Sequence, residues 1–223
     1  MHRGFLRAAG LEGTYETIRV AAGEGARALD DLRAQGYTGI SVTTPLKEEA
    51  FAHCVARDDV ALASGSVNVV LFAADGAHGY NTDGAGALGA LRAALATENL
   101  AGTSILILGA GATARSAAQA LRDAGARVSL WNRTHARAVA AAERAGVALW
   151  RRGDTFDAVL SALAPHATIA DDDVRDAILA APVVVDANYG PRATLGAALG
   201  RPVADGSAML EASARATFAL FAR

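Results

Sequence analysis

The sequence predicts an α/β protein with two domains, and three observations support this prediction. Strand-like apolar runs alternate with helical patterns along the chain, an order that is typical of a parallel sheet covered by helices. A fully apolar strand at residues 104–108 leads into a glycine-rich turn and a helix, which indicates that a second sheet begins there. The length of 223 residues is sufficient for two modest domains with their own cores.

Composition excludes several classes of protein. The net charge of −2 gives no reason to expect a nucleic-acid or acidic-membrane partner. The apolar runs are far shorter than a membrane span, and the N-terminal residues lack the apolar core of a signal peptide. The single cysteine, Cys54, excludes an internal disulfide and a metal site built from several cysteines, and its apolar neighbours predict a buried thiol. We therefore expect a soluble protein of a reducing compartment, the cytoplasm.

Four elements are expected ahead of residue 43. Helical patterns over residues 2–9 and 26–34 alternate with strand patterns over residues 15–20 and 37–42. This α-β-α-β order predicts a mainly parallel sheet. In such sheets ligands bind beyond the carboxyl ends of the strands, so the polar residues that follow residue 42 are candidate site residues.

Lys47 follows that strand and a proline-containing turn, and it begins the next helix. It is the only lysine among 21 basic Lys and Arg residues, so the other twenty are arginine. Arginine does not release its proton in proteins, whereas a partly buried lysine can. The lone lysine therefore suggests that a transferable proton is needed here. A solvated lysine in a first helical turn explains the spacing equally well.

The rest of the first segment predicts a hairpin and a helix. An apolar strand at 65–72 is followed by an Asp75-Gly76 turn of the hairpin type, and residues 84–96 form a helical pattern. Asp83 stands where the cap of that helix is expected. Asn68 interrupts the apolar strand, and a buried amide needs partners that a ligand could supply.

The second segment carries a nucleotide-binding fingerprint. The run Gly109-Ala110-Gly111-Ala112-Thr113-Ala114 lies between the strand at 104–108 and a helix, where glycines permit a tight turn and the close approach of a pyrophosphate. After the next strand comes Asn132-Arg133-Thr134, and Arg137 lies one helical turn further. Two cations and no acid at this position favour a 2′-phosphate, and hence NADP(H), over NAD. Solvated arginines at a helix start are the alternative.

Three runs of the first segment resemble, in order and approximate spacing, the signature of shikimate dehydrogenases and their quinate/shikimate relatives. They are Val42-Thr43-x-Pro45-x-Lys47, Gly65-x-Val67-Asn68 and Gly79-x-Asn81-Thr82-Asp83. The resemblance implies that Lys47 and Asp83 act as a pair on the hydroxyl that is oxidised, and that Asn68 and Asn81 help to hold the substrate. It also implies NADP for the Asn-Arg-Thr run.

Two later runs extend the resemblance. The run from Asp186 to Pro191 makes Tyr189 a candidate for lining the active site, with a packed loop aromatic as the alternative. Gly206-x-x-Met209-Leu210 resembles the closing motif of the family, in which the chain returns to the first domain beside the nicotinamide. Met209 would then pack on that ring, or it is an ordinary core methionine.

The resemblance fails at three positions, all of which concern substrate binding. The family opens with a strand and a Ser-x-Ser motif that this sequence lacks ahead of Met1. Ser213 stands where the family has a glutamine, and Ser41 stands where it has an asparagine. A missing strand leaves a sheet edge to be covered, for example by a partner chain in a homodimer. We expect either that the true start lies upstream of this sequence, or that the chain is a divergent member of the family with altered or weakened substrate binding.

These observations predict a substrate domain (1–85 plus 206–223) and a Rossmann-type NADP-binding domain (86–205). The expected reaction is NADP-dependent, reversible reduction of 3-dehydroshikimate to shikimate, with Lys47 as acid/base and Asp83 orienting it. A family relative acting on quinate or another hydroxy acid, and a non-catalytic NADP-binding protein, are the alternatives. The expected substrate-binding residues are Thr43, Asn68, Asn81, Tyr189 and Ser213. The expected cofactor-binding residues are Gly109, Ala110, Gly111, Ala112, Thr113, Asn132, Arg133, Thr134, Arg137, Gly206 and Met209.

Overall fold

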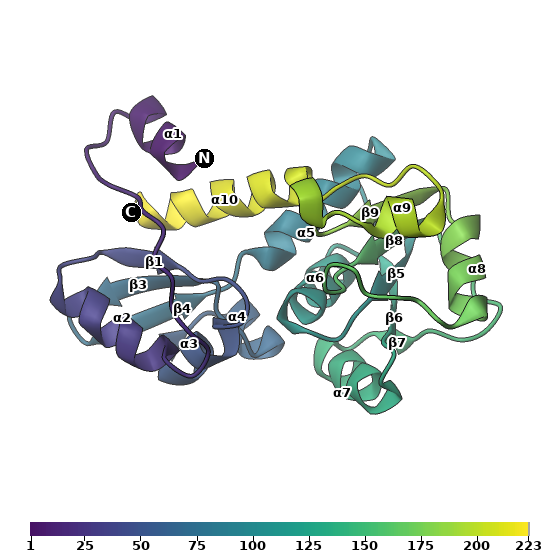
Figure 1. The fold of residues 1–223 in the computed structure, drawn as a ribbon, viewed down its shortest axis with the longest axis horizontal. Helices are drawn as coiled ribbons and strands as arrows, with labels where there is room; N and C mark the ends of the chain where they lie inside the picture. Colours follow the sequence, from purple (N-terminus) through teal and green to yellow (C-terminus); the bar gives the residue numbers. More distant parts are fainter. Residues whose placement is uncertain (223) are drawn as a thin grey trace. The chain divides into compact units, whose positions relative to one another are not determined.

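The computed structural model describes residues 1–222, which form two compact units. The first unit contains Met1–Thr82 and the described residues from Ser213 onward, and the second contains Asp83–Ala212. Each unit has its own sheet and its own helices (Figure 1). The α/β class that the sequence predicted is therefore confirmed.

The first unit is built around a four-stranded sheet in the order β1-β3-β4-β2. Its strands are β1 (Gly39–Ser41), β2 (Ala56–Arg57), β3 (Val69–Ala73) and β4 (Gly76–Tyr80). Its helices are α1 (His2–Ala8), α2 (Gly25–Ala34), α3 (Lys47–His53) and α4 (Asp59–Ser64), and the last part of α10 (Ser207–Phe221) belongs to it as well. Among the apolar residues buried between sheet and helices is Cys54, and burial raises the pKa of its thiol to about 11.

This first sheet is mixed, which corrects the expectation of a mainly parallel one. β3 and β4 form the predicted hairpin around Asp75-Gly76 and are antiparallel, since a tight turn leaves no room for a crossover. β1 also runs antiparallel to β3, and only the short pair β2–β4 is parallel. The α-β-α-β order of the sequence was a poor guide because residues 15–20 form no strand and β1 pairs with β3, which follows it in the chain.

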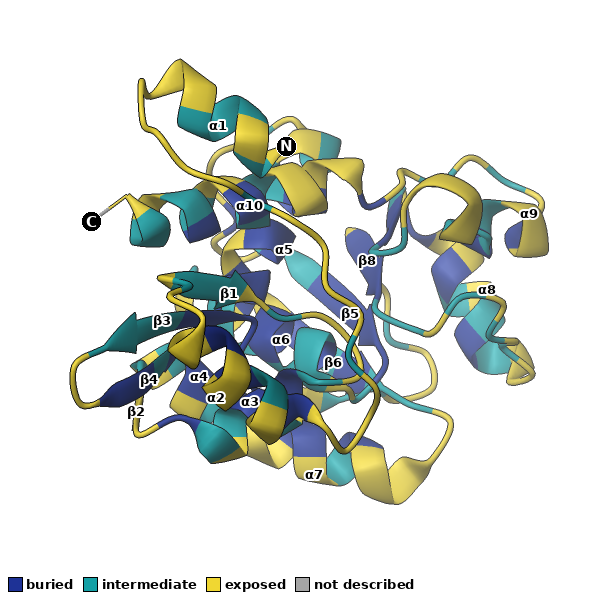
Figure 2. Cartoon of the chain, turned by 60° about the vertical axis from the view of Figure 1, so that its left-hand side comes forward, coloured by how far each residue is buried: buried dark blue, intermediate teal, exposed yellow. Residues whose placement is uncertain are grey.

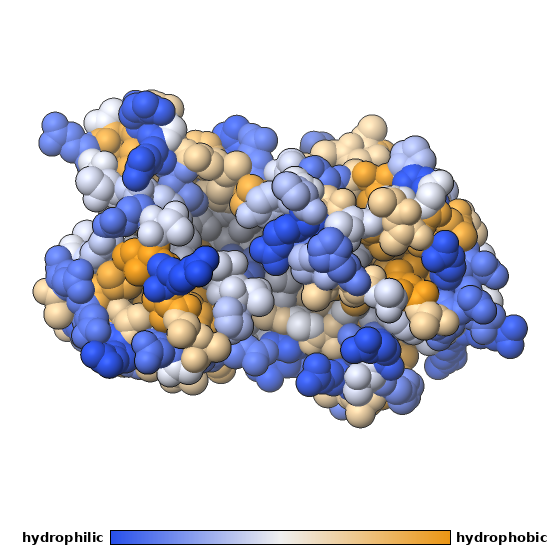
Figure 3. Space-filling view, in the orientation of Figure 1, coloured by the Kyte–Doolittle hydropathy of each residue, from blue (hydrophilic) through white to orange (hydrophobic). Residues whose placement is uncertain are grey.

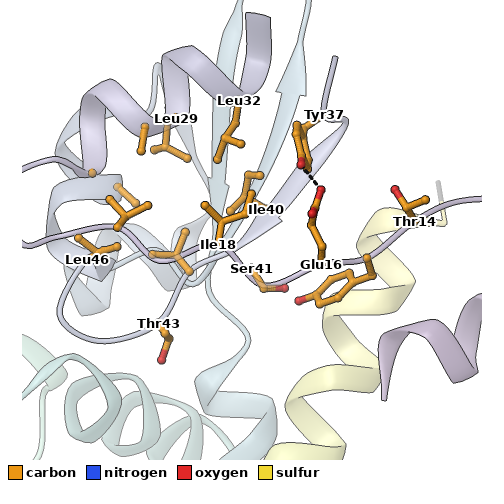
Figure 4. A pocket seen from close by; sticks show the side chains of 17 residues that line it. Thr14, Glu16, Ile18, Leu29, Leu32, Tyr37, Ile40, Ser41, Thr43 and Leu46 are labelled. Carbon is orange, nitrogen blue, oxygen red and sulfur yellow. Dashed lines mark hydrogen bonds between the residues drawn. The ribbon is translucent and has the colours of Figure 1, made fainter. Parts of the chain in front are cut away.

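The predicted strand at residues 15–20 is wrong. Its apolar residues alternate, but no described strand pairs with it, and it lies alongside a groove whose other wall is formed by β1 and α2. The groove encloses about 130 Å³, and Figure 4 shows Ile18 and Ile40 facing it, with the hydroxyl of Tyr37 donating a hydrogen bond to the Glu16 carboxylate. Figure 3 shows hydrophobic surface gathered over this part of the first unit. Alternation alone cannot make a strand without a neighbouring edge to pair with.

The second unit is a five-stranded parallel sheet in the order β7-β6-β5-β8-β9. Its strands are β5 (Ser104–Leu108), β6 (Arg127–Trp131), β7 (Ala148–Leu149), β8 (Ala158–Ser161) and β9 (Val183–Asp186). Its helices are α5 (Asp83–Leu95), α6 (Ala112–Asp123), α7 (His135–Ala145), α8 (Asp172–Ala180), the short η1 (Gly190–Arg192) and α9 (Leu195–Leu199). Strands buried on both faces read as continuous apolar runs, which is why the sequence identified this sheet well (Figure 2).

Small residues allow α5 and α6 to pack closely on one face of that sheet. A Cβ atom at Gly84 would lie 2.7 Å from the Cβ of Ala120 and 3.0 Å from the Ser116 carbonyl oxygen. At Gly89 it would lie 2.4 Å from the Cβ of Ala212 on α10. The glycine and alanine content of these helices thus sets the distance between them.

Among the described residues, no helix is both long enough and apolar enough to span a bilayer.

Candidate active site

Lys47 is the first residue of α3 and directly follows the turn that leaves β1. Only 8% of it is exposed, which is unusual for a lysine. Its carbonyl oxygen accepts a hydrogen bond from the backbone N–H of Val67 at 3.0 Å, so the start of α3 is tied to the approach to β3. The solvated lysine that the sequence also allowed does not fit this burial. Thr43, at the start of the same turn, is exposed.

Asn68 and Thr82 form a reciprocal pair at the ends of the hairpin. The Asn68 Nδ2 donates to Thr82 Oγ1 at 3.0 Å, and the Thr82 backbone N–H donates to Asn68 Oδ1 at 2.8 Å. Both residues are more than 90% buried. The partner that the amide of Asn68 requires is therefore supplied by the protein itself, through a threonine that the sequence analysis did not single out.

Thr82 also connects this pair to α10. Its Oγ1 lies 2.9 Å from the Oγ of Ser213 and 3.0 Å from the Oγ1 of Thr217. The predicted site residue Ser213 is thus hydrogen-bonded to the residue that precedes Asp83. Because hydroxyls can donate and accept, the group of Thr82, Ser213, Thr217 and Asn68 forms a hydrogen-bonded cluster.

Asn81 is held by a second set of hydroxyls. Its Nδ2 donates to Ser66 Oγ at 2.9 Å, to the Ser66 carbonyl at 3.0 Å and to Ser64 Oγ at 3.3 Å. The side chain is 6% exposed. The Asn81 amide nitrogen therefore finds its hydrogen-bond acceptors within the first unit. These contacts explain why the side chain is buried without invoking a ligand.

Asp83 is the first residue of α5 and is 7% exposed. Its Oδ2 accepts a hydrogen bond from Thr113 Oγ1 at 3.1 Å. Thr113 lies in the first turn of α6, immediately after the glycine turn. A side chain chosen as a cofactor residue and one chosen as a catalytic residue are therefore in direct contact.

The glycine turn has the form that a pyrophosphate requires. Gly109 adopts a φ of +117°, and a Cβ atom there would lie 3.0 Å from the Ala162 carbonyl oxygen. Gly111 caps α6 without any side-chain hydrogen bond, and no atom would lie within 4 Å of a Cβ added to it. Gly111 thus borders open space at the N-terminus of α6, where the helix dipole favours an anion.

The Asn132-Arg133-Thr134 run follows β6 and begins α7. Asn132 Nδ2 donates to the Thr134 carbonyl at 3.1 Å, which shapes the turn. Arg133 and Arg137 are exposed, and α7 has no side-chain N-cap. Two cations and an open helix N-terminus fit the doubly charged phosphate that the sequence suggested.

The other predicted residues have different surroundings. Tyr189 is 47% exposed, whereas Met209 is 6% exposed and packs in the core of the second unit. A Cβ atom at Gly206 would lie 2.2 Å from the Ala187 carbonyl oxygen, so close packing alone accounts for that glycine. The burial of Met209 agrees with the alternative of an ordinary core methionine.

Both units match known protein families. Residues 1–70 match the family described as shikimate dehydrogenase substrate binding domain, and residues 92–187 match shikimate / quinate 5-dehydrogenase. A shikimate dehydrogenase (NADP(+)) of Halobacterium salinarum is 35% identical over 222 residues, which cover 94% of this chain and 82% of that protein. The corresponding enzyme of Acidiphilium cryptum is 40% identical over 171 residues, or 77% of this chain and 60% of the relative.

The solved structures that resemble this chain include shikimate dehydrogenases, in agreement with the sequence relatives. Shikimate 5-dehydrogenase of Thermus thermophilus, in complex with NADP(H) and shikimate, has a TM-score of 0.82 and 32% identity, with 99% of this chain and 86% of that chain covered. The Aquifex aeolicus shikimate dehydrogenase has a TM-score of 0.83 and 30% identity, with 98% and 84% covered. The chain spans 60% and 58% of the lengths of the Acidiphilium and Caulobacter relatives. Sequence and fold together show that this chain belongs to the shikimate dehydrogenase family.

Proposed function

We propose that this chain catalyses the NADP-dependent, reversible reduction of 3-dehydroshikimate to shikimate. The first unit would hold the substrate and the second unit would hold the cofactor. The names of its relatives support the reaction, and the burial of Lys47 and Asp83 is the observation that carries it. An ammonium group and a carboxylate are seldom buried unless they are paired or used, and these two belong to the motifs that carry the family resemblance.

The chemistry divides between the cofactor and the chain. NADP(H) supplies or accepts the hydride when it is bound. Lys47 would donate a proton to the developing alkoxide in reduction and accept the hydroxyl proton in oxidation. Asp83 would orient the ammonium group and the reacting hydroxyl. The hydrogen bond from Thr113 fixes the Asp83 carboxylate, which supports an orienting role.

The residues present fit the cofactor. The open glycine turn and the uncapped start of α6 suit the pyrophosphate, and Arg133 with Arg137 suits the 2′-phosphate. We assign the cofactor to Gly109, Ala110, Gly111, Ala112, Thr113, Asn132, Arg133, Thr134 and Arg137. Roles for Gly206 and Met209 stay predictions.

Substrate binding has uneven support. We assign it to Thr43, Asn68, Asn81, Tyr189 and Ser213. Thr43 and Tyr189 are exposed and available, but the Asn81 amide nitrogen and the Ser213 hydroxyl already have protein partners. The engagement of Ser213 favours a second candidate function, in which the chain acts on quinate or another small hydroxy acid.

The purified chain tests these alternatives directly. NADP⁺ reduction is followed with shikimate, quinate and related hydroxy acids, and again with NAD⁺. Turnover of shikimate with NADP⁺ and little with NAD⁺ is expected. Faster turnover of another acid would support the second candidate. NADP⁺ binding without turnover of any acid would show a non-catalytic homologue. A cytoplasmic location and a homodimer stay predictions.

A further inference from the structure

Three hydroxyl groups meet at the last part of α10. Ser213 and Thr217 are four residues apart on this helix, so their side chains lie on the same face. The Oγ1 of Thr82 lies 2.9 Å from the Oγ of Ser213 and 3.0 Å from the Oγ1 of Thr217. All three residues belong to the first unit. The distances alone do not say which hydroxyl donates, but the burial of the groups and their other partners do.

The hydroxyl of Thr217 has to donate to Thr82. Thr217 is 4% exposed, and among the described residues Thr82 is the only hydrogen-bond partner of its side chain. A threonine inside a helix often donates to the carbonyl oxygen four residues back, here that of Ser213, but no such bond occurs in the part of the chain that the structure describes. Buried donors without an acceptor are rarer than buried oxygens with a spare lone pair. The Thr217 proton therefore lies toward Thr82 Oγ1.

Thr82 in turn donates to Ser213. A threonine hydroxyl carries one proton and can accept two hydrogen bonds. The amide nitrogen of Asn68, which can only donate, supplies one of these bonds at 3.0 Å, and Thr217 supplies the other. The Thr82 proton then has two possible acceptors. Ser213 Oγ at 2.9 Å is within the usual range, whereas Asn68 Oδ1 at 3.4 Å is beyond it and already accepts the Thr82 backbone N–H.

Ser213 accepts this bond and keeps its own proton for another partner. Its side chain is only partly buried, and Thr82 is its one hydrogen-bond partner among the described residues. A hydroxyl that accepts a hydrogen bond becomes a stronger donor, because consecutive hydrogen bonds polarise one another. The series from Thr217 through Thr82 thus ends on a donor at a partly exposed side chain. An oxygen of a hydroxy acid, whether hydroxyl or carboxylate, is an acceptor that fits this donor.

We propose that Thr217 is a positioning residue for substrate binding, which acts through Thr82 to make Ser213 a hydrogen-bond donor toward an acceptor oxygen of the substrate. Donation runs from Thr217 to Thr82 and from Thr82 to Ser213. This inference rests on the proposed function only in taking a hydroxy acid as the ligand of Ser213. The direction of donation is a property of the fold, so it can be tested without substrate.

Thermal unfolding of Thr82→Val, Thr217→Val, the double variant and the wild type tests this direction. Valine has the shape of threonine but lacks the hydroxyl. Thr82→Val leaves the buried Thr217 O–H without an acceptor, so adding Thr217→Val is expected to raise the melting temperature of that variant. In the wild-type background the same change is expected to lower it. A melting temperature that does not rise in the Thr82→Val background would overturn the proposed direction, since only a lone pair would then have lost its partner.

Steady-state kinetics tests the link to the substrate. Thr217→Val is expected to raise the KM for shikimate roughly three- to tenfold with little change in kcat, because Ser213 is no longer held as a donor. Thr217→Ser keeps the hydroxyl and should restore the wild-type KM. Ser213→Ala should also raise the KM, and adding Thr217→Val to it should have no further effect. An unchanged KM in Thr217→Val, or a further rise in that double variant, contradicts the proposal.

The two proposals can fail separately. A chain that shows the expected reversal of the melting temperatures but oxidises no hydroxy acid would retain the hydroxyl series and lose the proposed function. A chain that oxidises shikimate while Thr217→Val leaves the KM unchanged would retain the function and lose the positioning role of Thr217.

Discussion

The hydroxyl of Thr113 donates a hydrogen bond to the carboxylate of Asp83 across 3.1 Å. Thr113 lies in the first turn of the helix after the glycine turn, and Asp83 begins the helix that packs against it. Gly84 lacks a side chain that would separate these helices. The helix that follows the glycine turn and the proposed catalytic carboxylate are thus held together within one unit. We therefore expect the position of the cofactor to affect the orientation of the Asp83 carboxylate.

The first prediction concerns the loss of the hydrogen bond between Thr113 and Asp83. Thr113→Val keeps the shape of the side chain but deletes the donor, so the Asp83 carboxylate loses an orienting contact. We expect kcat/KM for shikimate to fall roughly three- to tenfold, because one such hydrogen bond contributes about 0.5–1.5 kcal/mol. Steady-state kinetics with Thr113→Ser as the control checks this. An equal loss in Thr113→Ser would show that the methyl group matters instead of the hydroxyl.

The second prediction concerns the hydroxyl cluster around Thr82. Thr82→Val removes the hydrogen bond that Asn68 Nδ2 donates to Thr82 Oγ1 and also breaks the contacts to Ser213 and Thr217. We expect the KM for shikimate to rise about tenfold while the Kd for NADP⁺ is unchanged, since the cluster lies in the first unit. Thr82→Ser should restore the wild-type KM. A lower melting temperature with an unchanged KM would indicate a purely structural cluster.

The third prediction tests the close packing of α5 on α6. In Gly84→Ala the added methyl would lie 2.7 Å from the Cβ of Ala120, so the helices must move apart. We expect a loss of roughly 1–3 kcal/mol in the free energy of unfolding, measured with urea. Gly4→Ala in α1 is the matched control, because no atom lies within 4 Å of a Cβ there. That control should be neutral or stabilising by up to about 1 kcal/mol.

The fourth prediction is a pH dependence at Asp58. This residue caps α4 by accepting the Ala61 N–H at 2.7 Å, and burial raises the pKa of its carboxyl despite backbone hydrogen bonds from Ala61 and Asn81. The folded state therefore holds the Asp58 proton more tightly than the unfolded state. This contribution to stability is present at low pH and is lost as the pH rises through the raised pKa.

Asp58→Asn separates the charge from the cap, because asparagine caps helices as well as aspartate does. We expect this variant to gain stability relative to the wild type as the pH rises from the ordinary aspartate pKa through the raised pKa of the folded state, where the wild-type carboxyl ionises. Asp58→Ala, which loses the cap, should cost about 1 kcal/mol. Urea unfolding at several pH values measures both. A difference between Asp58→Asn and wild type that stays constant with pH would contradict the burial argument.

The sequence predicted the second unit better than the first, for a physical reason. Strands such as 104–108 are buried on both faces, so their apolar runs and the glycine turn after them are visible without knowledge of the partners. Strand direction in the first sheet depends on which strands pair, and the alternation at residues 15–20 does not reveal that no described strand pairs with this segment. Local patterns specify elements, whereas pairing is a property of the whole fold.

In the candidate site, too, some residues could be recognised from the sequence and others only from the fold. Lys47 stood out because it is the only lysine, and Asp83 because of its motif. Thr82 lies in the same motif as Asp83 but received no role, since a threonine between two more conspicuous residues looks like part of a turn.

The most direct test of the account is the rate of NADP⁺ reduction by shikimate in Lys47→Ala, compared with wild type at saturating substrate and cofactor. If Lys47 transfers the proton, kcat should fall by about 10²–10⁴, while the Kd for NADP⁺ and the thermal stability change little. Lys47→Arg should not restore the rate, because arginine keeps its proton. A kcat in Lys47→Ala within about threefold of the wild-type value would contradict the central claim.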